Sequence, residues 1–91
     1  IRTLKKDSLA NLARLNLAST YNIQGRNQDA LSVLKAAVIT DPSSHQAWYN
    51  LALLYNELKD NENALHAFEK AMQRLEHAIS KSTGSPALKL S

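Results

Sequence analysis

The sequence contains an internal repeat, in which residues 45–78 align with residues 11–44. The two stretches align without a gap and are identical at ten positions, whereas unrelated sequences of ordinary composition would share about two or three. The identical residues are mostly small or aromatic, the types that set how closely helices pack. They are Ala13/Ala47, Asn16/Asn50, Leu17/Leu51, Ala18/Ala52, Tyr21/Tyr55, Asn22/Asn56, Asn27/Asn61, Ala30/Ala64, Leu31/Leu65 and Ala37/Ala71. The chain therefore contains two copies of one structural unit.

Apolar residues in the second copy have the spacing of amphipathic helices. Trp48, Leu51 and Tyr55 lie three or four residues apart, and after the polar break at 59–61 the spacing resumes at Phe68 and Met72. A break this short joins two helices as an antiparallel hairpin. No part of the sequence has the alternation of a strand, so the predicted fold class is all-α, built from antiparallel helix-turn-helix repeats.

This pattern resembles the tetratricopeptide repeat, a helix-turn-helix unit whose length equals the period of this sequence. Ala52 and Glu76 depart from the family pattern, which usually has Gly and Pro there. In the first copy Arg14 replaces the Trp, so we expect that helix to pack differently at its start. The residues that carry the resemblance are Trp48, Leu51, Tyr55, Ala64, Phe68 and Ala71. The resemblance implies a fragment with two complete repeats, whose hairpins follow a right-handed superhelix.

Four segments and four helices follow from this register. Residues 1–10 are either the end of a preceding helix or an N-terminal extension of the first helix; 11–44 and 45–78 are the two units; and 79–91 extend the last helix and end in a tail. That tail is either frayed or part of a capping element. We expect Asp7 or Ser8 to cap the first helix, which runs to about Gln24 and ends at a left-handed Gly25. Asn27 should cap a second helix that runs to about Thr40. Ser43 should cap a third that ends near Leu58, and Asp60 or Asn61 a fourth that runs to about Ser80.

Side-chain size predicts how these helices pack. We expect the aromatic rings of Trp48, Tyr55 and Phe68 to be largely buried between helices. The alanines at matching positions should mark the closest contacts between helices, because they let backbones approach. These are Ala18, Ala30, Ala52 and Ala64.

Charge and composition exclude several classes of function. The net charge of +3 comes from residues 1–10 and 79–91, each +2, while units 11–44 and 45–78 carry +1 and −2. No helix face has the basic stripe that nucleic-acid binding requires, and no run of eighteen apolar residues predicts a membrane span. The chain has no cysteine. This excludes disulfides and leaves the compartment open, with the cytoplasm as the default.

Catalytic and cofactor motifs are missing from the sequence. The three histidines, at 45, 66 and 77, include no pair spaced to bind a metal on one helix. The hydroxyls of residues 80–85 have no neighbouring base, and neither glycine lies in a phosphate-binding loop. We therefore expect no enzyme activity, no catalytic residue, no metal and no cofactor.

Recognition of protein is the function that remains. In the resembled family the first helix of each hairpin lines a concave groove. Carried over by position, the groove residues are Leu12, Leu15, Asn16, Ser19, Asn22, Ile23, Gln46, Tyr49, Asn50, Leu53, Asn56 and Glu57. Asparagine amides both donate and accept hydrogen bonds and suit a peptide backbone, although the same amides also suit plain exposure to solvent. Because Glu57 alone is ionised, we expect an uncharged or apolar peptide whose binding depends weakly on salt.

Some members of the resembled family bind the C-terminal carboxylate of a partner in this groove. That chemistry is not expected here, because Leu15 and Ser19 occupy the positions where such a groove would need Lys and Asn. The apolar stripe at Leu65, Met72, Leu75 and Ile79 has no following repeat to cover it. We expect it to contact residues 1–10, the tail at 87–90, a second copy or flanking repeats, and self-association is the favoured alternative for this fragment. Two alternatives to a peptide-binding module stay open: an assembly segment that stacks or self-associates, and a non-catalytic regulatory segment of a larger enzyme.

Overall fold

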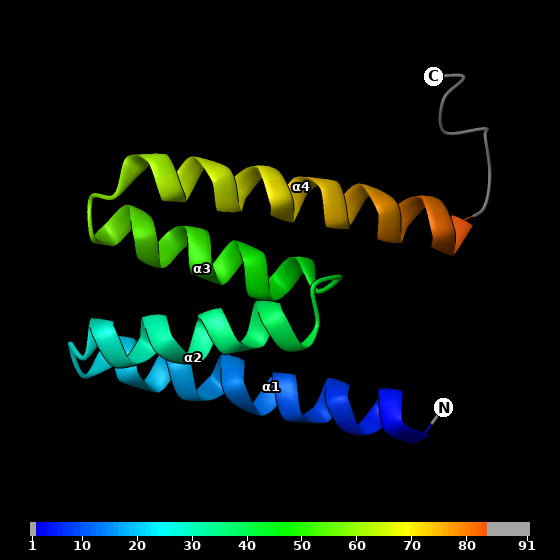
Figure 1. Cartoon of the computed structure of the whole chain (residues 1–91), viewed down its shortest axis with the longest axis horizontal. Coiled ribbons are helices and arrows are strands. Elements are labelled where there is room, and N and C mark those ends of the chain that lie inside the picture. The colour runs from blue at the N-terminus through cyan, green and yellow to red at the C-terminus, as the bar shows by residue number, and fades with distance from the viewer. Residues whose placement is uncertain (1, 84–91) are drawn as a thin grey trace.

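The chain folds into four helices that lie side by side. The computed structural model describes residues 2–83, and the side-chain surroundings of residues 9–80. The helices are α1 (Arg2–Ile23), α2 (Asn27–Thr40), α3 (His45–Glu57) and α4 (Asn61–Thr83) (Figure 1). Within residues 2–83 there is no strand. The all-α prediction is therefore confirmed, and each unit is a helical hairpin.

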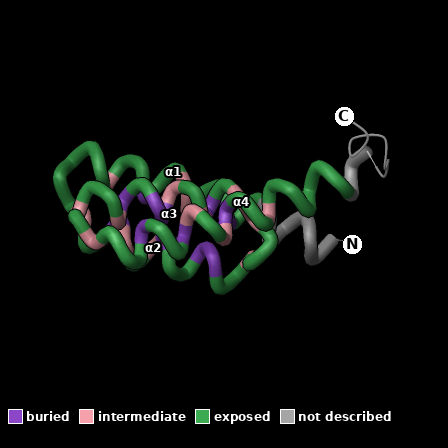
Figure 2. The backbone as a smooth tube through the Cα atoms, turned by 90° about the horizontal axis from the view of Figure 1, so that it is seen from above, coloured by how far each residue is buried: buried purple, intermediate pink, exposed green. Residues whose placement is uncertain are grey.

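Each helix packs against its neighbour in the chain, and α1 also touches α3. The core between them consists largely of alanine and leucine. Figure 2 shows the buried segments in the middle of the bundle. All four alanines predicted at the closest contacts are buried: Ala18, Ala30, Ala52 and Ala64. Among the described helices, none combines the length and the apolar character needed to cross a bilayer.

The three aromatic rings that were predicted to be largely buried pack against the core and keep part of their surface exposed. Trp48, Tyr55 and Phe68 are only partly buried and pack against the buried cluster from outside. The Trp48 indole Nε1–H donates to the Pro42 carbonyl at 2.9 Å.

The two outer helices are longer than the repeat register requires. α1 runs without interruption from Arg2, so residues 2–10 extend the first helix and do not end a preceding one. The predicted caps at Asp7 and Ser8 are therefore wrong, because both residues lie inside α1. At the other end α4 continues to Thr83, past the predicted end at Ser80. The predicted tail at 84–91 lies outside the described residues.

Helix starts differ from the prediction by one residue in two places. α2 is preceded by Arg26, which makes no side-chain capping bond, and Asn27 is already helical. α3 is capped by Ser44 and not by Ser43, since the Ser44 hydroxyl accepts from the Ala47 amide at 3.2 Å. Asp60 precedes α4, as one of the two alternatives predicted, and its carboxylate accepts from the Asn63 amide at 3.4 Å.

Candidate functional site

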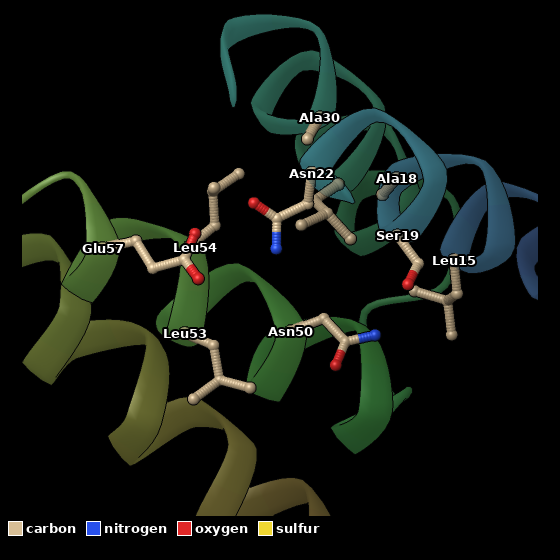
Figure 3. A pocket seen from close by; sticks show the side chains of 10 residues that line it. Leu15, Ala18, Ser19, Asn22, Ala30, Asn50, Leu53, Leu54 and Glu57 are labelled. Carbon is tan, nitrogen blue, oxygen red and sulfur yellow. The ribbon is translucent and has the colours of Figure 1, made fainter. Parts of the chain in front are cut away.

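A polar-rimmed hollow lies between α1 and α3. Its volume is about 190 Å³. Figure 3 shows side chains of both helices around it, with part of α2 behind. The lining residues are Leu15, Ala18, Ser19 and Asn22 from α1, Ala30 and Leu34 from α2, and Asn50, Leu53, Leu54 and Glu57 from α3. We call this space the central hollow.

The central hollow has an apolar floor and a polar rim. Ala30, Leu34 and Leu54 are all less than 5% exposed and close its floor. The amides of Asn22 and Asn50 stand at the rim, on α1 and α3 respectively, so donors and acceptors are offered from two sides. Among the side chains that line the hollow, Glu57 alone carries a formal charge. The hollow therefore offers a ligand neutral hydrogen-bonding groups above an apolar surface.

A second hollow continues along the same side of the molecule, at the start of α3. Its volume is about 360 Å³, and Leu15 borders both hollows. Leu9 and Leu12 on α1 are 61% and 52% exposed, so this wall is apolar and open to solvent. The lining residues are Leu9, Asn11, Leu12, Leu15, Asp41, Ser43, Ser44, His45 and Gln46. An extended ligand in the central hollow would therefore meet a further apolar wall beside it.

The structure divides the predicted groove residues into three groups. The first group lines the central hollow: Leu15, Ser19, Asn22, Asn50, Leu53 and Glu57. Leu12 and Gln46 line the second hollow. Asn16, Ile23 and Asn56 are exposed and line neither of the two. Tyr49 also lies apart from both hollows, because its ring packs on Phe68 of α4 at a centroid distance of 6.0 Å.

Tyr49 belongs to an apolar surface formed by α3 and α4. A hollow of about 570 Å³ lies on it, lined by His45, Gln46, Tyr49, Phe68, Ala71, Met72 and Leu75. Met72 and Leu75, two residues of the predicted self-association stripe, line this hollow, whereas Leu65 and Ile79 do not. Leu65 is 61% exposed and Ile79 45% exposed.

The contribution of α3 to this surface was not among the predictions from the sequence, although the alignment of the two units contains it. Tyr49 and Phe68 are the counterparts of Leu15 and Leu34, which lie on neighbouring helices of the first unit and line the central hollow together. The repeat therefore brings Tyr49 and Phe68 together in the second unit as well.

Comparison with known families agrees with the paired hairpins. The sequence model of the tetratricopeptide repeat matches residues 1–45 and 24–78, and so covers most of the chain. The chain belongs to the tetratricopeptide repeat family. Tetratricopeptide repeats generally mediate protein–protein interaction.

One curated relative is a much larger protein. The chain is 42% identical over 53 residues to the rhomboid protease GluP of Bacillus subtilis (strain 168). The match covers 58% of the chain but only 10% of that protein. The tetratricopeptide chain described here is thus similar to a small part of its relative.

Proposed function

We propose that this tetratricopeptide chain binds an extended, uncharged or apolar peptide segment of a partner protein in the central hollow. The observation that carries the proposal is the composition of this hollow. Apolar residues close its floor, asparagine amides stand at its rim, and a single carboxylate, that of Glu57, lies among its described side chains. Such a surface favours a peptide backbone and apolar side chains over a charged ligand.

The two sides of the hollow suit different parts of a bound strand. Asn22 on α1 and Asn50 on α3 supply groups that hydrogen-bond main-chain amides and carbonyls without reading sequence. Leu15 and Leu53 supply apolar area for side chains of the ligand, and Leu53 is 40% exposed in the free chain. Because the contacts are mainly apolar and neutral, affinity should change little with salt concentration.

Fluorescence anisotropy with labelled peptides tests this proposal. The probes are short end-blocked peptides of Leu, Val, Ala and Asn, and versions of them in which Lys or Glu replaces the polar positions. We expect the neutral peptides to bind more tightly, and Asn50→Ala to weaken their binding several-fold. Asn56→Ala is the matched control, because Asn56 lies on the same helix but outside the hollow. Equal effects of the two substitutions, or binding that is lost between low and moderate salt, would contradict the proposal.

A second proposal is that the chain is a non-catalytic segment of a larger protein. It rests on the relative, in which the matched stretch is 10% of the length. The expected result is that the purified chain turns over none of a panel of peptidase and esterase substrates. Turnover that copurifies with the chain and is abolished by a single substitution would overturn this proposal.

A further inference from the structure

The molecule ends in two exposed faces that belong to different helices. We define the C-terminal face by Tyr49, Phe68, Met72 and Leu75 of α3 and α4, which line one apolar hollow. We define the N-terminal face by Ala13, Leu17 and Thr20 of α1, all of which are exposed. Met72 is 61% exposed and Leu17 is 44% exposed. Both faces thus present apolar side chains to solvent.

The interface inside the molecule shows how these two faces fit together. Where the first unit meets the second, Leu34, Ala37 and Val38 of α2 are buried in one cluster with residues of α3. The α3 residues in that cluster include Ala47, Leu51 and Leu54. This interface is the only covered junction between units within residues 9–80, and it consists of two dissimilar halves.

The outer helices α1 and α4 carry the counterparts of both halves of this interface. The counterparts of the α2 half in the second unit are Phe68, Ala71 and Met72 on α4. Met72 is exposed, Phe68 is partly buried and Ala71 is 8% exposed. The counterparts of the α3 half in the first unit are Ala13, Leu17 and Thr20 on α1. Ala13 and Leu17 are identical to their counterparts in α3, and Ala71 to its counterpart in α2. The two end faces are therefore complementary to each other because the sequence repeats.

The lengths of α1 and α4 indicate that the C-terminal face is not covered by a third unit in the same register. A third unit would begin its first helix at residue 79, the counterpart of His45, after a turn at 75–78. Instead α4 is helical throughout that stretch and continues to Thr83. In the same way α1 is helical at residues 7–10, where a preceding unit would need a turn like 41–44.

The two helical extensions also match each other. α1 begins nine positions before Asn11, the counterpart of the first residue of α3. α4 ends nine positions after Arg74, the counterpart of the last residue of α2. Both extensions project from the same side of the molecule, beyond α2 and α3, as Figure 1 shows. If α1 of another molecule packed on α4 as α3 packs on α2, the two extensions would run antiparallel along each other over this equal length.

We propose that the C-terminal face of one copy binds the N-terminal face of a second copy, head to tail, and so continues the stack of repeats between molecules. The net charge of α1 is +3 and that of α4 is zero, so like-charge repulsion does not oppose this contact. A heterologous contact of this kind leaves one face free on each terminal copy. It therefore adds further copies and does not stop at a closed dimer.

Sedimentation of the whole chain over a hundredfold concentration range tests the proposal. The wild-type chain is expected to grow from one copy to dimers and larger species. Leu17→Glu blocks the N-terminal face and Met72→Glu blocks the C-terminal face, because each buries a charge on association. Each variant alone should stay a monomer. An equimolar mixture should form dimers that grow no further, since each variant retains the face that the other lacks.

The mixture distinguishes the head-to-tail contact from a two-fold contact between C-terminal faces. A two-fold contact would leave Leu17→Glu dimeric and would give no new species on mixing. Either that result or a wild-type chain that is monomeric at all concentrations would overturn the proposal. Ile39→Glu is the matched control, because Ile39 is 77% exposed on α2 and belongs to neither face. It should associate like the wild-type chain. Circular dichroism checks that each variant is helical. Leu17 and Met72 lie outside the central hollow, so this outcome is independent of peptide binding.

Discussion

The two units share a register and a hairpin fold, but they differ in which positions are buried. Val38 of the first unit is 8% exposed, whereas its counterpart Met72 is 61% exposed. On the first helices the order reverses, since Leu17 is 44% exposed and its identical counterpart Leu51 is 3% exposed. Both differences have one cause: α2 and α3 pack on each other, and α1 and α4 are outermost. Burial in this chain is thus a property of the stack and not of the single hairpin.

The two units begin with different side-chain contacts. In the first unit Asn11 is buried, and its amide donates to the Ala37 carbonyl at 3.0 Å while its oxygen accepts from Arg14. In the second unit Trp48 stands at the Arg14 position, and its ring lies edge-on to His66 at 6.5 Å. Arg14 thus bonds within its own helix, whereas the Trp48 ring contacts a residue of α4. The same backbone register therefore accepts a polar or an aromatic anchor.

The largest predicted effect is a difference in stability between substitutions of Leu51 and Leu17, which occupy matching positions in the two units. Leu51→Ala should lower the free energy of unfolding by roughly 2–5 kcal/mol, because it leaves a cavity in a packed core. Leu17→Ala should lower it by about 1 kcal/mol or less, since that side chain is 44% exposed. Urea unfolding at concentrations where the chain is monomeric measures both. Equal losses of stability would show that the two leucines are equally buried, and would contradict the conclusion that burial depends on the neighbouring helices.

A smaller effect is expected where the helices of one unit approach most closely. Ala64 is 4% exposed, and Ala64→Leu should destabilise the chain by roughly 1–3 kcal/mol, because added methyl groups force the backbones apart. Ala36→Leu is the control, since Ala36 is exposed on α2 and the same enlargement there should change stability by about 0.5 kcal/mol or less. Thermal unfolding followed by circular dichroism compares them. A neutral Ala64→Leu would mean that α3 and α4 separate at little cost.

The smallest effect concerns the turns within the two hairpins. Gly25 has φ +78°, and its counterpart Lys59 has φ +64°. The left-handed conformation costs a residue with a Cβ atom roughly 1–2 kcal/mol, partly offset by the greater freedom of glycine in the unfolded chain. Gly25→Ala should therefore destabilise by about 0.5–1 kcal/mol, although a Cβ there meets nothing within 4 Å. Lys59→Gly should stabilise by a similar amount. Chemical denaturation measures the free energy of unfolding of both variants, and changes of the same sign in Gly25→Ala and Lys59→Gly would contradict the prediction.

The sequence by itself determined the hairpins and their register. Apolar spacing of three to four residues defines helix faces, and the identities between the two units align them, so the C-terminal end of α2 and the small residues of the core were predicted correctly. Gly25 was likewise predicted as the left-handed end of α1, because glycine adopts that conformation without steric cost. Six of the predicted groove residues also come together at the central hollow. These features depend on local periodicity and on side-chain size, which the sequence states directly.

Only the tertiary structure decided which faces are covered. Tyr49 has the sequence position of a groove residue, yet its ring packs on Phe68 at the C-terminal face. Trp48, Tyr55 and Phe68 have the pattern of core residues, yet they are only partly buried. The sequence marks a residue as apolar and assigns it to a helix face. Its burial depends on whether a second helix lies over that face. In this chain only α2 and α3 have neighbours on both sides, and the outward faces of α1 and α4 lack them among the described residues.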